Sequence, residues 1–82
     1  AAAALEDVSL AAGLEEALGK LLDRERYVIG LRFGIGGEPE HTLAQVAAKL
    51  GVSLERVRQI QVRAILKMRT PHLRKVADPF LN

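Results

Sequence analysis

Apolar residues recur along the chain at steps of three and four positions, which is the spacing of one face of a helix. The first stripe of this kind comprises Leu10, Leu14, Ala17, Leu18 and Leu21. Asp7 or Ser9 is a suitable N-cap for this helix, because either side chain can accept a hydrogen bond from the backbone of the first turn. Gly13 and Gly19 weaken the helix, since glycine is a poor helix former.

A second helix is expected between Asp23, as its N-cap, and Gly34, as its C-terminal stop. Its apolar side consists of Tyr27, Val28 and Leu31. Residues 34–41 include three glycines and one proline, so this segment is expected to form a surface loop.

The third helix has clear signals at both ends. Thr42 and Gln45 have the spacing of a capping box, and Gly51 can end the helix. The inward side is expected to contain Leu43, Val46, Ala47 and Leu50.

A fourth helix, capped by Ser53, is expected to reach about Arg69, and Pro71 closes it or starts a short fifth helix. The tight glycine-containing turn before it is typical of a helix-turn-helix. Ala47 lets the two helices approach closely, and Gly51 permits a left-handed turn. The residues that can fill a core shared by both helices are Val46, Leu50, Val52, Val57 and Ile60.

We therefore expect an all-α fold, because no strand-like alternation occurs. The expected architecture is a small bundle of about five helices, with a helix-turn-helix at about residues 42–69. Residues 9–82 are expected to form one domain, and residues 1–8 a flexible extension or a cloning remnant.

The fourth helix has one side that the core leaves free. At about 100° per residue, its inward positions are Val57, Ile60, Ala64 and Met68. The opposite side carries Glu55, Gln59, Val62 and Leu66, with Arg58 and Arg69 along one edge and Arg63 and Lys67 along the other. The second helix of a helix-turn-helix enters the DNA major groove and presents its N-terminal residues to the bases.

Several groups on this helix suit contacts with DNA. Glu55 could accept a hydrogen bond from a cytosine amino group, and Gln59 could pair with adenine. Ser53 and the free amides of the helix N-terminus suit a phosphate oxygen, and the flanking basic residues suit the two phosphate backbones. For Glu55, a favourable interaction with the helix dipole explains the residue equally well.

Charge is distributed unevenly between the two halves of the 82-residue chain. The net charge is +2, but residues 1–40 sum to −4 (four basic minus eight acidic) and residues 41–82 to +6 (eight basic minus two acidic). From Arg56 to Lys75 there are seven basic residues and no acidic one. This clustering favours a polyanion-binding protein, with a solvated basic helix face as the alternative explanation.

Composition excludes several other classes. Cysteine is absent, so disulfides, thiolate zinc sites and a cysteine nucleophile are excluded. No apolar run approaches the roughly 20 residues that span a membrane, and the N-terminus does not resemble a secretory signal. His41 and His72 have no nucleophile or metal-ligand spacing nearby, so we expect no enzyme, cofactor, metal or small-molecule substrate.

The stretches Leu31-Arg-Phe-Gly-Ile, His41-Thr-Leu and Val57-Arg-Gln-Ile resemble the carboxyl-terminal domain (region 4) of bacterial RNA polymerase sigma factors of the sigma-70 family. The resemblance covers roughly residues 18–82, and the chain stops where such proteins end. It implies a cytoplasmic bacterial protein whose second helix-turn-helix helix recognises the −35 promoter element of double-stranded DNA. It also implies docking on the flap tip of the RNA polymerase β subunit, with activators or anti-sigma proteins as further candidate partners.

The resemblance also implies roles for individual residues. Glu55, Arg58 and Gln59 match positions that contact bases or the adjacent backbone. The positions that the resemblance assigns to phosphates or upstream DNA are Arg24, Arg32, Thr42, Arg63 and Lys67. Ser53 and Arg56, at the start of the fourth helix, are expected to bind phosphates as well. The structural alternatives are a helix-end charge for Arg32 and a simple cap for Thr42, and a capping Thr42 is expected to keep its amide free for DNA.

The sequence departs from the family pattern at several positions. Leu54 stands where primary sigma factors usually carry an arginine that reads guanine. The loss of this arginine–guanine contact should cost about 1–3 kcal/mol of discrimination at that base. Gln61 and Leu66 stand where glutamate and arginine are common. We therefore expect relaxed or altered promoter preference, typical of an alternative sigma factor, although Leu54 and Leu66 could instead pack on a protein partner. Pro79 is expected to interrupt a final short helix, which leaves a docking role for Phe80 and Leu81 open.

Two other functions fit the residues. The first is a helical protein-interaction module that binds a partner helix in an apolar groove. The second is the helix-turn-helix output domain of a response regulator, which would bind paired half-sites as a dimer and not bind polymerase.

Overall fold

The computed structural model describes residues 8–71 and 73–81. Its helices are α2 (Val8–Gly19), α3 (Asp23–Phe33), α4 (Leu43–Leu50), α5 (Leu54–Met68) and α6 (Arg74–Ala77), with single 3-10 turns at η1 (Ile35–Gly37) and η2 (Asp78–Phe80). No strand occurs in these residues, so the predicted all-α class is confirmed. In the described ranges four helices have eight residues or more, and α6, the short helix predicted after Pro71, has four.

The predicted N-terminal extension, residues 1–8, lies outside the described residues except for Val8, with which α2 begins. Asp7 and His72 also lie outside them. Ser9 lies within α2, so it does not cap this helix.

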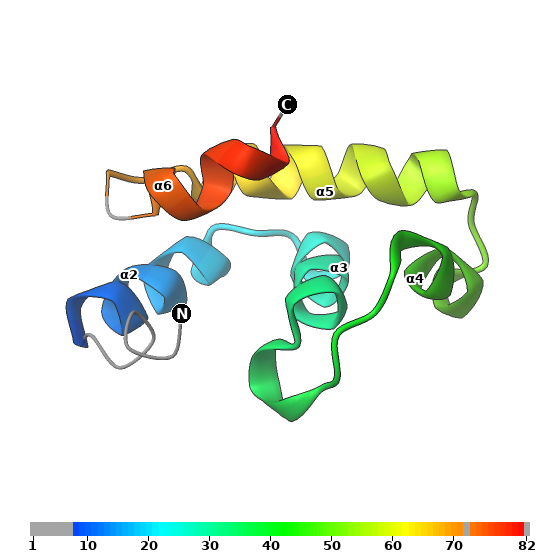
Figure 1. Ribbon diagram of the computed structural model, residues 1–82, viewed down its shortest axis with the longest axis horizontal. Helices are drawn as coiled ribbons and strands as arrows, with labels where there is room; N and C mark the ends of the chain where they lie inside the picture. Colours follow the sequence, from blue (N-terminus) through cyan, green and yellow to red (C-terminus); the bar gives the residue numbers. More distant parts are fainter. Residues whose placement is uncertain (1–7, 72, 82) are drawn as a thin grey trace.

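The longest helix, α5, runs along one side of the molecule, and α2, α3 and α4 lie beneath it in chain order (Figure 1). The short α6 turns back alongside the C-terminal end of α5. Every other α-helix that the structure describes therefore contacts α5 directly. None of these helices has the length and apolar character needed to cross a membrane.

The core consists of two clusters that meet at α3 and α5. The first cluster joins α2, α3, α5 and the C-terminal segment, and its buried residues are Ala17, Leu21, Ile29, Ala64, Ile65, Met68, Leu73 and Ala77. The second joins α3, α4 and α5, and its buried residues are Val28, Leu31, Val46, Ala47, Val57 and Ile60. Leu50 and Val52 pack against the second cluster, so the core predicted for the helix-turn-helix is confirmed.

The sequence pattern misassigned one side of α3. Tyr27 was expected to face inward, but it is 45% exposed, whereas Ile29 is 1% exposed. The reason is that α3 lies between both clusters, with Ile29 directed to one and Val28 and Leu31 to the other. A single stripe at helical spacing cannot describe a helix that is buried on two sides.

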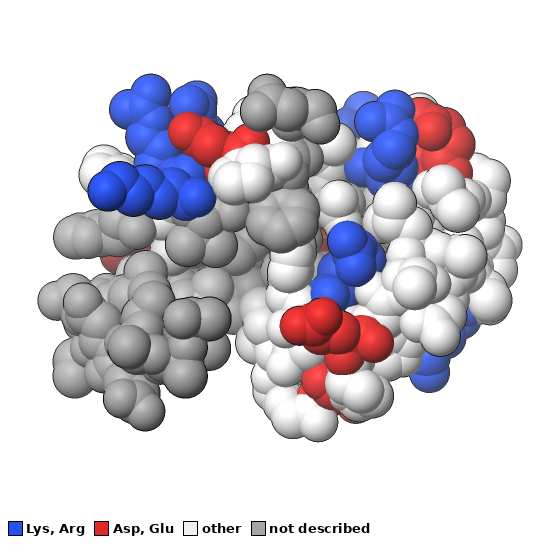
Figure 2. All heavy atoms as spheres, viewed as in Figure 1, with Lys and Arg blue, Asp and Glu red and all other residues white. Residues whose placement is uncertain are grey.

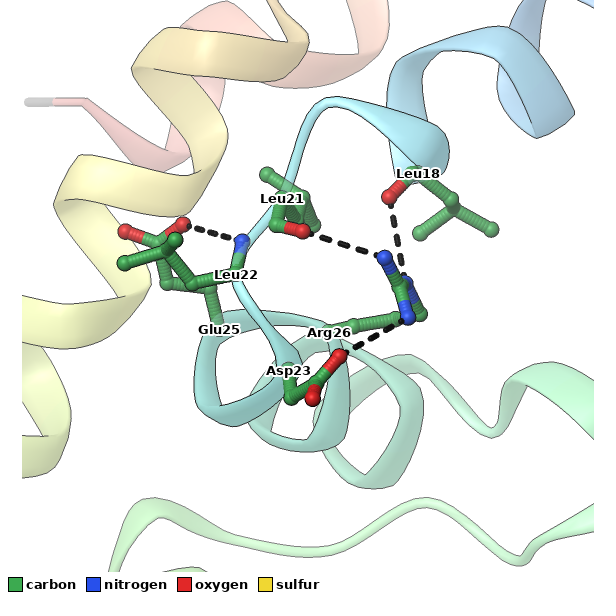
Figure 3. A network of polar contacts seen from close by, with 6 residues as sticks. All are labelled: Leu18, Leu21, Leu22, Asp23, Glu25 and Arg26. Carbon is green, nitrogen blue, oxygen red and sulfur yellow. Dashed lines mark hydrogen bonds and ion pairs between the residues drawn. The ribbon is translucent and has the colours of Figure 1, made fainter.

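Polar contacts close the connection between α2 and α3 (Figure 3). Asp23 is the first residue of α3 and not its cap, because the capping position belongs to Leu22. The Leu22 amide donates to Oε1 of Glu25 at 2.9 Å, so the first turn is closed from inside the helix. The Arg26 guanidinium donates to the carbonyls of Leu18 (3.2 Å) and Leu21 (3.0 Å), and it pairs with Asp23 at 3.3 Å.

The predicted helix stops at Gly34 and Gly51 are confirmed. Gly34 has φ +65° and Gly51 has φ +69°, and each amide donates to the helix that it ends. The loop between Gly34 and Thr42 contains the single turn η1 and has no other regular secondary structure.

The expectation that Pro79 interrupts the final short helix is confirmed in part. The α-helix α6 ends at Ala77, two residues before Pro79, and the chain continues as the single 3-10 turn η2, where Pro79 occupies an early position that needs no amide donor. Leu81 packs against the first cluster, so its side chain contributes to the fold.

Candidate nucleic-acid interface

The N-terminus of α4 is closed by the predicted capping box. The Gln45 amide donates to Oγ1 of Thr42 at 3.1 Å, and the Thr42 amide donates to Oε1 of Gln45 at 2.8 Å. The Thr42 amide is therefore not free for a phosphate, contrary to our expectation, because Gln45 occupies it. The donors that remain are the Thr42 hydroxyl and the first-turn amides of Leu43 and Ala44, which have no acceptor within the helix.

The turn between α4 and α5 is short and fixed at both sides. The amides of Gly51 and Val52 both donate to the carbonyl of Ala47, at 2.9 and 3.2 Å. Ser53 caps α5 as predicted, because its Oγ accepts a hydrogen bond from the Arg56 amide at 3.0 Å. The amides of Leu54 and Glu55 lie in the first turn, where helix geometry leaves them available.

The outward side of α5 is accessible as predicted. Glu55, Gln59 and Leu66 are exposed and Val62 is partly exposed. The four predicted inward positions, Val57, Ile60, Ala64 and Met68, are buried. Gln61 and Ile65 are buried as well, so the inward side is wider than predicted. Gln59 thus lies at the centre of an accessible surface that no described element covers.

Glu55 and Arg58, the two other predicted base-reading residues, bind each other. Arg58 donates from Nε to Oε2 of Glu55 at 3.0 Å and from Nη2 to Oε1 at 2.6 Å. The hydrogen bonds and charge of Arg58 lower the pKa of the Glu55 carboxyl, and Glu55 raises the pKa of Arg58. Both groups are therefore charged at neutral pH, and each compensates the other. Figure 2 shows adjoining basic and acidic side chains over the N-terminal end of α5, at the upper right.

Lys67 is engaged in a different contact from the predicted one. Its Nζ donates to Oε1 of Glu25 at 2.7 Å, and the Glu25 side chain is only 7% exposed. Burial alone would raise the pKa of Glu25, but hydrogen bonds from Lys67 and the Leu22 amide, with the charges of Lys67 and Arg63, lower it. Lys67 is thus bound within the protein, which its position on the edge of α5 did not indicate.

Arg32 is also held by internal partners. Its Nε donates to Oε1 of Gln61 at 2.9 Å, and its Nη1 donates to the His41 carbonyl at 2.8 Å. The side chain remains partly exposed beside the N-terminus of α4. Arg32, for which a surface charge at a helix end was the structural alternative, therefore links α3, the loop and α5.

The other predicted phosphate-binding side chains are unpaired. Arg24, Arg56 and Arg63 are exposed, and no side-chain hydrogen bond or ion pair joins them to the described part of the chain. Arg56 and Arg63 lie on α5 itself, whereas Arg24 lies on the first turn of α3. Arg56 and Arg63 are thus the exposed cations of α5 that form no side-chain pair with the described residues, whereas Arg58 pairs with Glu55 and Lys67 with Glu25.

Glu25 and Gln61 are buried polar residues that bind Lys67 and Arg32, respectively. Neither contact was predicted from the sequence. In the sequence Glu25 stands between Arg24 and Arg26, and Gln61 stands between Ile60 and Val62. Their partners lie 42 and 29 positions away, respectively. The only sequence signal was the polar residue itself at an inward helical position. Within the described ranges, no group of three or more His, Asp or Glu residues is arranged to hold a metal ion.

Comparisons with known proteins point to one family. The family description "Sigma-70, region 4" matches residues 17–70. The proteins named RNA polymerase sigma factor SigA in Listeria monocytogenes and Listeria innocua are each 43% identical over 69 residues, which is 84% of this chain and 18% of theirs. RNA polymerase sigma factor SigA4 of Synechococcus elongatus is 46% identical over 52 residues, 63% of this chain and 17% of that protein. The chain thus spans less than a fifth of these relatives, and no solved structure matches it.

Proposed function

The chain belongs to the sigma-70 region 4 family, and from this premise we propose that it recognises the −35 element of bacterial promoters through α5 during transcription initiation. In this proposal α5 lies in the major groove, and Glu55, Arg58 and Gln59 contact bases or the adjacent backbone. The protein acts in the bacterial cytoplasm without a cofactor and is not an enzyme.

One observation carries the proposal: Gln59 lies exposed at the centre of the outward side of α5, without a hydrogen-bond partner among the described residues. A glutamine at this place can form two hydrogen bonds with one adenine, which is direct sequence readout. The α4–α5 turn fixes the orientation of the helix through Gly51 and Ser53, so the side chain is presented from a rigid support.

The surrounding groups suit phosphate contacts, which position a helix without reading sequence. Arg56 and Arg63 offer exposed positive charges along one edge of α5. Arg32 and the free first-turn amides of α4 offer donors before α5, and Ser53 and the first amides of α5 offer more. Arg24 is a further exposed cation, and it lies on α3.

A titration of the protein with promoter duplexes tests the proposal. If about four to six phosphates are neutralised, the logarithm of affinity should fall with the logarithm of salt concentration at a slope near −4 to −5. Gln59→Ala should abolish the preference for a −35 duplex over a scrambled one. Arg63→Ala is the matched control, because loss of a phosphate contact should weaken both duplexes alike. Arg63 serves better than Lys67 here, since Lys67 is paired with Glu25.

Other results would favour the other functions. Equal binding of any polyanion, unchanged by Gln59→Ala, would favour a helical protein-interaction module. Dimeric binding to paired half-sites would favour a response-regulator output domain.

We also propose that the domain docks on the flap tip of the RNA polymerase β subunit, with activators or anti-sigma proteins as further partners. Retention of this protein by the isolated β flap would support that part, and its absence would leave DNA recognition alone.

A further inference from the structure

Leu54 is an apolar side chain that the described part of the domain does not bury. It is the first residue of α5, it is 48% exposed, and it belongs to neither of the two core clusters. Leu50 and Val52, which precede it, pack against the second cluster instead. The core of the helix-turn-helix therefore does not account for a leucine at this position.

The backbone that carries Leu54 is fixed on both sides. Before it, the Gly51 amide donates to the Ala47 carbonyl at 2.9 Å. After it, the Arg56 amide donates to Oγ of Ser53 at 3.0 Å. The leucine side chain is therefore presented from a defined place at the start of α5.

The charged side chains next to Leu54 are occupied with each other. Arg58 lies one helical turn further along the same side of α5. It donates to both carboxylate oxygens of Glu55, at 2.6 and 3.0 Å. Leu54 is thus the apolar group of the first turn, beside a pair whose charges compensate each other.

An apolar groove on a protein is a poor match for this leucine. The other exposed leucine on α5 is Leu66, which is 54% exposed. At about 1.5 Å per residue the two lie about 18 Å apart along the helix axis, so they form no contiguous patch of the kind that marks protein interfaces. Leu54 is bordered by the polar residues Ser53, Glu55 and Arg58. A small apolar target suits it better.

The DNA major groove contains one such target, the 5-methyl group of thymine. The other groups on the base edges there are mainly hydrogen-bond donors and acceptors, with which a leucine cannot pair. The N-terminal residues of a recognition helix are the ones that reach the base edges. A leucine in the first turn of α5 therefore matches a thymine in chemistry and in place.

We propose that Leu54 is a specificity-determining residue: its side chain contacts the 5-methyl group of one thymine in the −35 element and so selects thymine at that base pair. The inference rests on the proposed function, because it names a base that α5 reads. Since leucine forms no hydrogen bond, the methyl group alone carries the preference.

Deoxyuridine tests this directly, because it lacks the 5-methyl group and keeps every hydrogen-bonding group of thymine. The duplex is first selected by the wild-type protein from a pool randomised over the −35 element, and each thymine in it is then replaced singly. One replacement should weaken binding about fourfold, the usual effect of removing one buried methyl group. At the same base pair, 5-methylcytosine should bind about fourfold better than cytosine.

Leu54→Ala connects the methyl group to the residue. The variant should fold, because position 54 is exposed and alanine favours helix. It should bind the thymine and deoxyuridine duplexes equally, and selection with it should no longer enrich thymine at that position. Leu66→Ala is the matched control on the same helix, and it should keep the fourfold difference.

A deoxyuridine effect that persists in Leu54→Ala would overturn the inference, and so would the absence of any deoxyuridine-sensitive position. It would also be overturned if Leu54→Ala selected the same sequence as the wild-type protein but lost retention by the β flap, the result expected if Leu54 packs on a protein. Failure of the wild-type protein to enrich any sequence from the pool would instead overturn the proposed function.

Discussion

The Lys67 ammonium and the Leu22 amide both donate to the same oxygen, Oε1 of Glu25, at 2.7 and 2.9 Å. Through Glu25, this oxygen joins the start of α3 to the C-terminal end of α5, 42 positions apart in the chain. The carboxylate is buried, whereas the Lys67 side chain is 40% exposed. The contact therefore holds the helix that carries Gln59 against the rest of the domain.

Lys67→Ala should destabilise the protein more than Arg63→Ala. Removal of Lys67 leaves a buried carboxylate without its main partner, which should lower the free energy of unfolding by about 1–2 kcal/mol after allowance for the partly exposed lysine. Removal of the exposed Arg63 should change it by no more than about 0.5 kcal/mol. Urea unfolding measures both values. Equal stability of the two variants would show that the Glu25–Lys67 pair contributes nothing.

The Glu25 contact also predicts a dependence of stability on pH. Because the folded state lowers the pKa of Glu25 below its usual value of 4.5, the contribution is complete above about pH 4.5. It is lost as the pH falls through the lower pKa of the folded state. The difference in unfolding free energy between the wild-type protein and Glu25→Gln should therefore be constant near neutral pH and shrink toward pH 3.

Glu16→Gln is the control for this experiment, since Glu16 is exposed on α2 and forms no ion pair within the described chain. It should keep the pH profile of the wild-type protein. A wild-type advantage over Glu25→Gln that persists undiminished at pH 3 would contradict the assignment.

The two helix-ending glycines should differ in their tolerance of alanine. Both have positive φ, +65° at Gly34 and +69° at Gly51, so alanine at either place should cost about 1–2 kcal/mol. A Cβ at Gly34 would also lie 2.8 Å from the Glu38 carbonyl oxygen, whereas one at Gly51 would have no described heavy atom within 4 Å beyond its own residue, its chain neighbours and the backbone of its own helix. Thermal unfolding should therefore show a greater loss for Gly34→Ala than for Gly51→Ala, and the reverse order would be inconsistent with this loop geometry.

Local signals in the sequence predicted much of this structure. The Thr42–Gln45 capping box, the Ser53 cap and the stops at Gly34 and Gly51 depend on residues within a few positions of each other. Such contacts follow directly from residue type and spacing. The outward side of α5 was also predicted correctly, because its pattern is periodic over a helix of 15 residues.

The remaining features depend on tertiary contacts that no local pattern contains. The inward position of Ile29 and the exposure of Tyr27 follow from the burial of α3 on two sides. The partners of Arg32 and Lys67 lie 29 and 42 positions away, so both cations resembled free surface charges. The sequence therefore indicated which residues are basic but not which of them the fold has already paired.

Leu54→Arg should restore guanine discrimination. Leu54 is 48% exposed at the start of α5, where an arginine could form a bidentate contact with guanine. Competition between −35 duplexes that differ at one guanine should show a gain in discrimination of about 1–3 kcal/mol. Leu66→Arg is the matched control on the same helix, and it should raise affinity for all duplexes without discrimination. A uniform gain from both variants would argue against base contact at Leu54.

The most direct measurement of the central claim is an NMR titration of the isotope-labelled protein with a −35 duplex, followed through backbone amides and the Gln59 side-chain amide. The account predicts that the largest shifts occur at Gln59, Glu55 and the first turns of α4 and α5, with little change in α2. Shifts confined to the exposed surface around Leu22 and Tyr27, with the Gln59 signals unmoved, would contradict it.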